Sequence, residues 1–127
     1  MEWFENLPEN CPPEDAYSPQ EEVFYRRVTV FPVEEKDFEV YKTIKEGQNF
    51  GSKECMAHAV SVSNDLEKTL YSLTFPIYAG QKVAKIILNP KDGVVKKTGK
   101  AEDHYSWWRA KSFSLNTIKE AKVSNES

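Results

Sequence analysis

KVAKIILNPKDGVVKKT, residues 82–98, contains two strand-like runs of aliphatic residues separated by a turn. In the central Asn-Pro-Lys-Asp-Gly turn, proline fixes φ at the start and Gly93 supplies a positive φ. We therefore predict that residues 82–88 and 94–98 are the two strands of a hairpin. A hairpin at this place makes an antiparallel sheet the centre of the predicted fold.

Three further segments have strand-like compositions. Residues 22–31 are β-branched and aromatic and end at Pro32. Residues 104–113 are rich in aromatic side chains and are predicted to be the last strand. Residues 55–62 fit a strand or a helix, and their Val-Ser-Val end favours a strand.

Two segments have helical patterns. Residues 34–46 place apolar side chains on one face, and Gly47 follows at a position typical of a helix C-cap. Residues 65–73 follow Asn64, which is spaced as an N-cap from a glutamate at the third helical position. Three leucines at helical spacing support the second prediction.

These elements predict one α+β domain over residues 1–127, with a mainly antiparallel sheet of about five strands and two or three short helices. An acidic, proline-rich arm, residues 1–21, precedes an α+β core at residues 22–113. Residues 114–127 form a short C-terminal segment that contains an amphipathic piece. Residues 123–127 are expected to be frayed.

The charge is distributed unevenly, although the net charge is only −3 at pH 7. Residues 1–25 hold seven acidic residues and no basic one, whereas residues 82–122 hold ten basic and four acidic ones. The acidic arm can lie over the basic end of the same molecule, or the basic end can offer a binding face. Trp3, Phe4 and Leu7 are too apolar for a free tail, so we expect them to pack the arm on the body.

The predicted location is the cytoplasm, and the protein is expected to be soluble. The chain has no run of 18 apolar residues, and residues 1–7 lack the features of a secretory signal. Cys11 and Cys55 would then stay reduced and behave as small buried hydrophobes. With His58 and His104 they do not form the two close pairs of a zinc site, so we expect neither a metal nor another cofactor.

Several motifs together resemble a family of small bacterial proteins, mostly cyanobacterial, that has no assigned activity. They are Trp-Phe-Glu-Asn-Leu-Pro and Cys-Pro-Pro in the arm, Phe-Tyr-Arg at 24–26, Cys55 with Ser-Val-Ser at 61–63, and His-Tyr-Ser-Trp-Trp at 104–108. The resemblance covers residues 1–113. It implies a cytoplasmic domain that stands alone, and it assigns no catalytic residue.

The candidate ligand- or anion-binding residues are polar or aromatic side chains that interrupt predicted strands. They are Tyr25, Arg26, Ser61, Ser63, His104, Trp107 and Arg109. Arg26 would share a strand face with Phe24 and Val28, where an arginine must be paired. Either Glu102 or Asp103 forms an internal salt bridge with it, or the guanidinium holds a phosphate or carboxylate ligand.

The serines and His58 have plainer interpretations as well. Ser61 and Ser63 would lie on a face of small side chains, which lets a helix pack closely or lets a flat ligand approach the backbone. His58 would lie on the opposite, apolar face, where a hydrogen-bonded core histidine is the expected role. Ser61 or a second serine could pair with a histidine as in hydrolases, but the chain has no Gly-x-Ser-x-Gly motif.

Trp107 and Trp108 should point to opposite faces of an extended strand. Trp108 has the small neighbours Ser106 and Ala110, so we expect it in the core. Trp107, beside Arg109, is expected on a partly exposed surface near the arm or a groove. There it either packs under the arm or offers a stacking platform for a base.

Three functions from different classes are compatible with these features. The first is a non-catalytic binding or interaction module for another protein or a small anionic ligand, which we favour because the chain has no catalytic signature and no glycine-rich phosphate loop. Another is single-stranded nucleic-acid binding by the basic, aromatic C-terminal half. The pI of about 5.5 speaks against it, and no membrane partner is expected.

The remaining candidate function is enzymatic and depends on a resemblance to ADP-ribosyltransferase-like toxin domains. The chain has an arginine strand with Tyr25-Arg26, then a Ser-x-Ser strand with Ser61 and Ser63, then a short helix and a further strand. The resemblance implies that the arginine holds a dinucleotide pyrophosphate and the serine buttresses the site. The chain lacks the late glutamate motif of such domains, so Glu102 or His104 would take its place.

Overall fold

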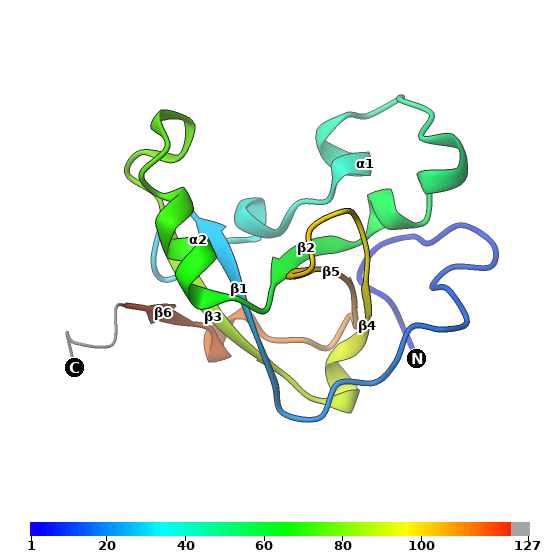
Figure 1. The fold of residues 1–127 in the computed structure, drawn as a ribbon. Helices are drawn as coiled ribbons and strands as arrows, with labels where there is room; N and C mark the ends of the chain where they lie inside the picture. The colour runs from blue at the N-terminus through cyan, green and yellow to red at the C-terminus, as the bar shows by residue number, and fades with distance from the viewer. Residues whose placement is uncertain (123–127) are drawn as a thin grey trace.

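The computed structural model describes residues 1–122 and has one antiparallel sheet of six strands with two α-helices (Figure 1). The strands are β1 Glu22–Val28, β2 Val60–Ser63, β3 Lys82–Leu88, β4 Gly93–Lys97, β5 His104–Arg109 and β6 Lys119–Ala121. The helices are α1 Tyr41–Ile44 and α2 Leu66–Ser72. The predicted α+β class with a mainly antiparallel sheet is confirmed. The frayed end predicted for residues 123–127 lies outside the described residues.

Six 3-10 helices connect these elements. They are η1 Glu35–Phe38, η2 Gly51–Lys53, η3 Met56–His58, η4 Pro76–Tyr78, η5 Pro90–Asp92 and η6 Leu115–Thr117. Among residues 1–122, no helix is both long enough and apolar enough to cross a membrane.

The strands β3 and β4 are not paired, so the predicted hairpin at residues 82–98 is wrong. The strand order is β4-β5-β2-β1-β3-β6, which places β3 and β4 in opposite halves of the sheet. Residues between them form η5, in which the Asp92 carboxylate accepts a hydrogen bond from the Asn89 N–H at 2.8 Å. This capped turn leads to the far edge of the sheet and does not fold β4 back on β3.

Two further predictions differ from the structure. The predicted helix at residues 34–46 is divided into η1 and α1 by an extended link, because Phe38 and Val40 both enter the core and residues two apart cannot share one face of a helix. Within residues 55–62, Met56–His58 form η3, whereas the Val-Ser-Val end forms strand β2, as its composition favours. By contrast, α2 agrees with the prediction, although its N-cap is Asp65, which accepts from the Lys68 N–H at 3.0 Å.

The core lies on one face of the sheet. That face carries Phe24, Val28, Val60, Val62, Ala84, Ile86, Leu88, Val95 and Trp107. Phe38 and Val40 cover it on one side, and Phe113 and Leu115 pack against the same cluster. On the opposite face α2 packs against β1, and the N-terminal arm pairs with the outer edge of β4 and with the end of β5 (Figure 1).

Both adjacent tryptophans are fully buried, so the expectation of a partly exposed Trp107 is wrong. Trp107 packs edge-to-face on Phe113 in the core and donates to the Asp92 carbonyl at 3.0 Å. Trp108 lies on the other face and donates to the Cys55 carbonyl at 3.0 Å. Both can be buried because the sheet is covered on both faces here, and neither indole is exposed as a stacking platform.

Iodide quenching checks the burial of these tryptophans. In a Trp3→Phe background, we expect Trp107→Phe and Trp108→Phe variants to resist iodide equally, because neither remaining indole has exposed surface. Free tryptophan in the same buffer calibrates full access. Strong quenching of either variant would contradict the burial described here.

The arm lies along β4 and β5. Trp3 forms a β-bridge with Ala110, and Tyr17 forms one with Val95. Phe4 stacks on the Arg109 guanidinium, whose central carbon lies 3.7 Å from the ring centroid. These contacts hold both ends of the arm against the sheet.

The two cysteines form a disulfide, so the expectation that both are free is wrong. They are 44 residues apart in the sequence, and their Cα atoms lie 5.5 Å apart. They meet because the arm returns along the sheet to the end where the segment after α1 lies (Figure 1). That juxtaposition depends on the tertiary fold and has no local signal in the sequence.

Candidate functional site

The sheet splits between β1 and β2. Tyr25 of β1 pairs with Ser63 of β2, and the register contains no further pair between these strands. In contrast, β1 pairs with β3 along its whole length, and all four residues of β2 pair with β5. Beyond Tyr25 the two strands therefore diverge, and Arg26 and Ser61 face the opening.

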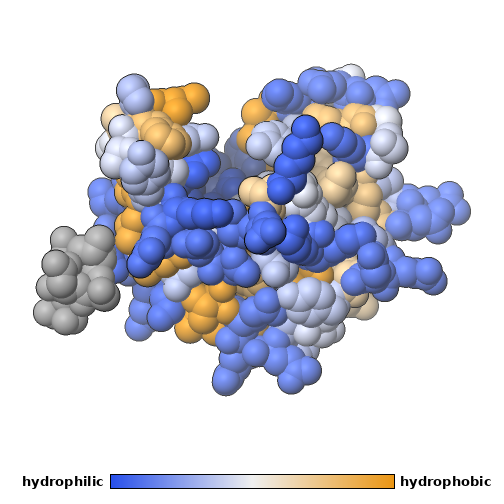
Figure 2. All heavy atoms as spheres, in the orientation of Figure 1, coloured by the Kyte–Doolittle hydropathy of each residue, from blue (hydrophilic) through white to orange (hydrophobic). Residues whose placement is uncertain are grey.

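The split is the floor of a cleft of about 500 Å³. One wall is the α2 lobe, residues 66–80, which contains α2 and η4. The other wall comes from residues 36–40 and from the α1 lobe, residues 41–54. Figure 2 shows the surface hollowed between the two lobes at the top of the view.

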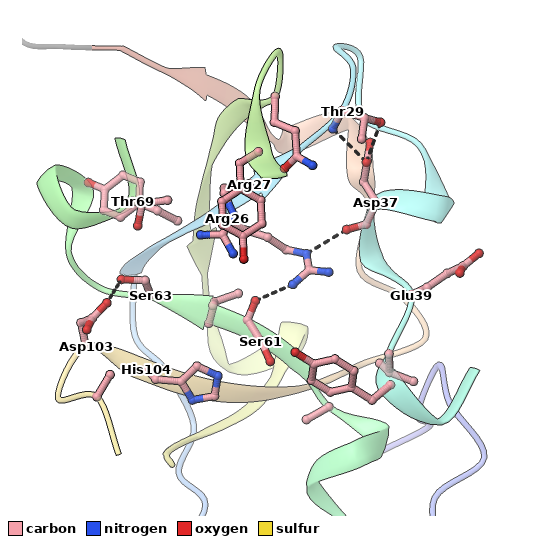
Figure 3. A pocket seen from close by; sticks show the side chains of 18 of the residues that line it. Arg26, Arg27, Thr29, Asp37, Glu39, Ser61, Ser63, Thr69, Asp103 and His104 are labelled. Carbon is pink, nitrogen blue, oxygen red and sulfur yellow. Dashed lines mark hydrogen bonds between the residues drawn. The ribbon is translucent and has the colours of Figure 1, made fainter. Parts of the chain in front are cut away.

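Arg26 lies in the split itself (Figure 3). Its Nε donates to the Asp37 carbonyl oxygen at 2.8 Å, and its Nη1 donates to the Ser61 carbonyl oxygen at 2.7 Å. The side chain thus bridges the gap that the backbones of β1 and β2 no longer close. The two backbone bonds also fix the direction of the guanidinium within the cleft.

Arg26 has no carboxylate partner within residues 1–122, so the predicted salt bridge to Glu102 or Asp103 is wrong. Asp103 accepts from Ser63 Oγ at 2.6 Å, and this bond holds the pKa of Asp103 below its usual value. Glu102 is exposed and does not line the cleft. Asp103 lines the cleft, but its carboxylate is paired with Lys68 and Ser63.

Asp37, which accepts from Arg26 through its backbone carbonyl, directs its carboxylate to Thr29. Its Oδ1 accepts from the Thr29 N–H at 2.9 Å and from the Thr29 hydroxyl at 2.8 Å. Burial lowers the pKa of Arg26 to about 10, so the side chain stays protonated at neutral pH. Arg26 is therefore a partly buried cation that forms no ion pair with a carboxylate within the described chain.

Arg27 lines the same cleft, although the sequence analysis did not select it. Its Nη1 donates to Ser72 Oγ of α2 at 3.0 Å, and its guanidinium carbon lies 3.7 Å from the Tyr78 ring centroid. Adjacent strand residues normally point to opposite faces. Both arginines reach one cleft because the sheet opens beside them, and the alternating sequence pattern carries no signal of that opening.

Five of the predicted residues meet in this cleft: Tyr25, Arg26, Ser61, Ser63 and His104. Ser61 and Ser63 lie on the same face of β2, and His104 starts the neighbouring strand β5 opposite Ser63. Two hydrogen bonds fix Ser63 at the cleft. Its Oγ donates to Asp103 Oδ2 and accepts from the Asp65 N–H at 3.0 Å.

His104 extends its ring into the cleft (Figure 3). Its Nδ1 lies 3.0 Å from the Thr98 carbonyl oxygen. Because a carbonyl only accepts, this bond places the proton on Nδ1, and Nε2 is the unprotonated nitrogen of the neutral ring. Nε2 can therefore accept a hydrogen bond from a ligand.

The other two predicted residues lie outside the cleft. Trp107 is in the core, as described above. Arg109 is only 3% exposed and makes a two-pronged ion pair with Glu35, at 3.1 and 3.0 Å, while Phe4 covers its other side. Its role is to join the arm to η1, so the prediction of a ligand-binding Arg109 is replaced by a structural one.

His58 is hydrogen-bonded, as expected, with its Nδ1 2.8 Å from the Glu54 carbonyl oxygen. In the part of the chain that the structure describes, no three histidine, cysteine, aspartate or glutamate side chains gather closely enough to hold a metal ion. A scan against protein-family models finds no matching family, and searches of curated proteins and of solved structures find no matching protein. Function is therefore inferred from the chemistry of the cleft.

Proposed function

We propose that the protein is a binding module that holds a small anionic ligand in the cleft between β1 and β2. One observation carries the proposal: Arg26 is a partly buried cation, it lines an open cleft, and it has no ion-pair partner in residues 1–122. Removing a charge partly from water without a counter-charge is unfavourable. An oxyanion bound beside Arg26 would remove that penalty.

The donors left over at the site suit an oxyanion. A guanidinium has five N–H donors in a planar fork. Arg26 uses two of its donors on carbonyl oxygens, and Arg27 uses one on Ser72. The remaining donors of two adjacent arginines can hold a phosphate or carboxylate group through paired hydrogen bonds. Ser61 and His104 lie beside them as further polar contacts.

Substitution of Arg26 tests the proposal. We expect Arg26→Met to weaken the binding of inorganic phosphate at least tenfold, because the cation in the cleft is lost, and Arg26→Lys to restore part of it. The measurement is an NMR titration at constant ionic strength, with acetate as a second probe that separates phosphate from carboxylate ligands.

The matched control is Lys97→Met, which removes the same charge from an exposed position of β4 outside the cleft. This variant should bind phosphate like the unmodified protein. Equal phosphate affinity in Arg26→Met and Lys97→Met would refute the anion site.

A second candidate is an ADP-ribosyltransferase-like enzyme. It is favoured by the meeting of Arg26, Ser61, Ser63 and His104 in one cleft, although they come from three strands. In the toxin domains that the sequence resembles, the arginine holds a pyrophosphate and the serine buttresses the site. Because Glu102 lies outside the cleft, His104 would take the place of the glutamate.

Incubation with NAD separates the two candidates. Release of nicotinamide that is lost in His104→Ala would favour the enzyme. NAD binding without release would leave the binding module as the better description.

We also propose the cytoplasm as the location, as the sequence and its resemblance to bacterial proteins suggest. Thiols are kept reduced in that compartment unless a specific oxidant acts on them. Cys11 and Cys55 are both partly exposed, so a cytosolic dithiol could reach their bond. In that setting the disulfide would be reversible.

A further inference from the structure

The α1 lobe forms a wall of the cleft but has little attachment to the sheet. None of residues 41–54 is buried. Tyr41 and Ile44 of this lobe line the cleft, yet they are 53% and 56% exposed. Packing against the core therefore contributes little to holding this wall in place.

Side-chain hydrogen bonds and an ion pair connect residues of the lobe to one another. Lys42 Nζ lies 2.7 Å from Glu54 Oε2 and donates to the Gln48 carbonyl at 2.9 Å. The Phe50 N–H donates to Glu54 Oε1 at 3.2 Å. These contacts join the two ends of the lobe to each other, and none of them reaches the sheet.

The C-terminal end of the lobe is tied to the rest of the molecule at Cys55. Its sulfur is bonded to Cys11, and its carbonyl accepts from Trp108 Nε1. Cys11 belongs to the arm, which the bridges of Trp3 and Tyr17 hold on β5 and β4. The disulfide is therefore the covalent link between a weakly packed cleft wall and an anchored segment.

We propose that the Cys11–Cys55 disulfide is a redox-controlled clamp on the anion cleft. In the oxidised protein it holds the α1 lobe in place as a wall, and its reduction releases the lobe and weakens ligand binding. Reduction breaks the S–S bond and forms two thiols, with two electrons and two protons supplied by a dithiol that itself becomes a disulfide. The inference rests on the proposed anion-binding function.

The expected consequence follows from the conformational equilibrium of the lobe. When the wall is in place for only a fraction of the time, the apparent affinity for a ligand is the intrinsic affinity multiplied by that fraction. Ordering a released lobe also opposes binding through the entropy of its backbone. We expect inorganic phosphate to bind at least tenfold more weakly to the reduced protein.

The first test compares phosphate titrations of the oxidised protein, the dithiothreitol-reduced protein and a Cys11→Ser/Cys55→Ser variant. The reduced protein and the variant should bind phosphate equally weakly, and dithiothreitol should not affect the variant. Absence of binding to the oxidised protein would refute the proposed function. Equal binding by all three would refute the clamp alone.

Hydrogen exchange shows whether the lobe responds by itself. In the reduced protein, amides of residues 41–54 should exchange much faster, while those of β2 and β5 keep their protection. Loss of protection throughout β2 and β5 would overturn the proposal, because the disulfide would then maintain the whole fold rather than the wall of the cleft.

A linkage experiment tests the same coupling in the opposite direction. If the disulfide favours phosphate binding, saturating phosphate must favour the disulfide by the same factor. A tenfold coupling would lower the reduction potential in glutathione buffers by about 30 mV. Arg26→Met should show no such shift, and an equal shift in that variant would assign the effect to salt and overturn the clamp.

Discussion

Replacement of both Cys11 and Cys55 by serine is expected to lower the free energy of unfolding by about 4 kcal/mol. The disulfide closes a loop between residues 44 apart, and a cross-link of that length removes about this much chain entropy from the unfolded state. For a chain of this size the midpoint of thermal unfolding should fall by about 15 °C. Calorimetry of the variant and of the oxidised protein measures both quantities.

The reduced form of the unmodified protein is the control for this variant. It should unfold at the same midpoint as the double serine variant, since both lack the same cross-link. An unchanged midpoint after reduction would mean that the arm and the segment after α1 remain together in the unfolded state. The loop-closure argument would then fail.

The elements set by local sequence could be predicted, whereas their pairing could not. β3 and α2 lie where the aliphatic run and the leucine spacing place them. The hairpin prediction failed because a turn sequence specifies how the chain bends but does not specify which strand it next meets. Here β4 pairs with β5, which comes later in the chain, and three strands separate β4 from β3 in the sheet.

The candidate site was predicted in part for a similar reason. Arg26, Ser61 and His104 could be selected because polar groups in otherwise apolar strands need a partner. Arg27 could not, because its position at the cleft depends on the split between β1 and β2. Trp107 was assigned to a partly exposed surface because its neighbour Arg109 suggested a wet face, whereas Arg109 is itself buried in its ion pair with Glu35.

The same split explains why the arginine is needed. A continuous antiparallel sheet would satisfy the facing backbone groups of β1 and β2 with each other. Once the strands diverge, the Ser61 carbonyl depends on the Arg26 side chain. Arg26 therefore has two roles: it satisfies a backbone carbonyl that the split leaves without a strand partner, and it places a fixed cation in the cleft.

Gly93→Ala is expected to lower the free energy of unfolding by about 3–5 kcal/mol. Gly93 has φ of 129° and ψ of −157°, a region that residues with a Cβ atom avoid at a cost of about 1–3 kcal/mol. An added Cβ would also overlap the backbone carbonyl oxygen of Trp108, and the strand would have to shift to relieve it. Urea unfolding followed by tryptophan fluorescence measures the loss.

The position of Gly93 makes this shift damaging beyond the residue itself. The preceding carbonyl, that of Asp92, accepts from Trp107 Nε1 and from the Ala110 N–H, both at 3.0 Å. Displacing the start of β4 would therefore weaken two bonds that join the crossing chain to β5 and its end. Gly47→Ala is the matched control, since Gly47 also has a positive φ but has open space around its Cβ position. It should lose only about 1 kcal/mol, and an equal loss in both variants would show that the backbone angle alone matters at Gly93 and that β4 tolerates the added methyl group.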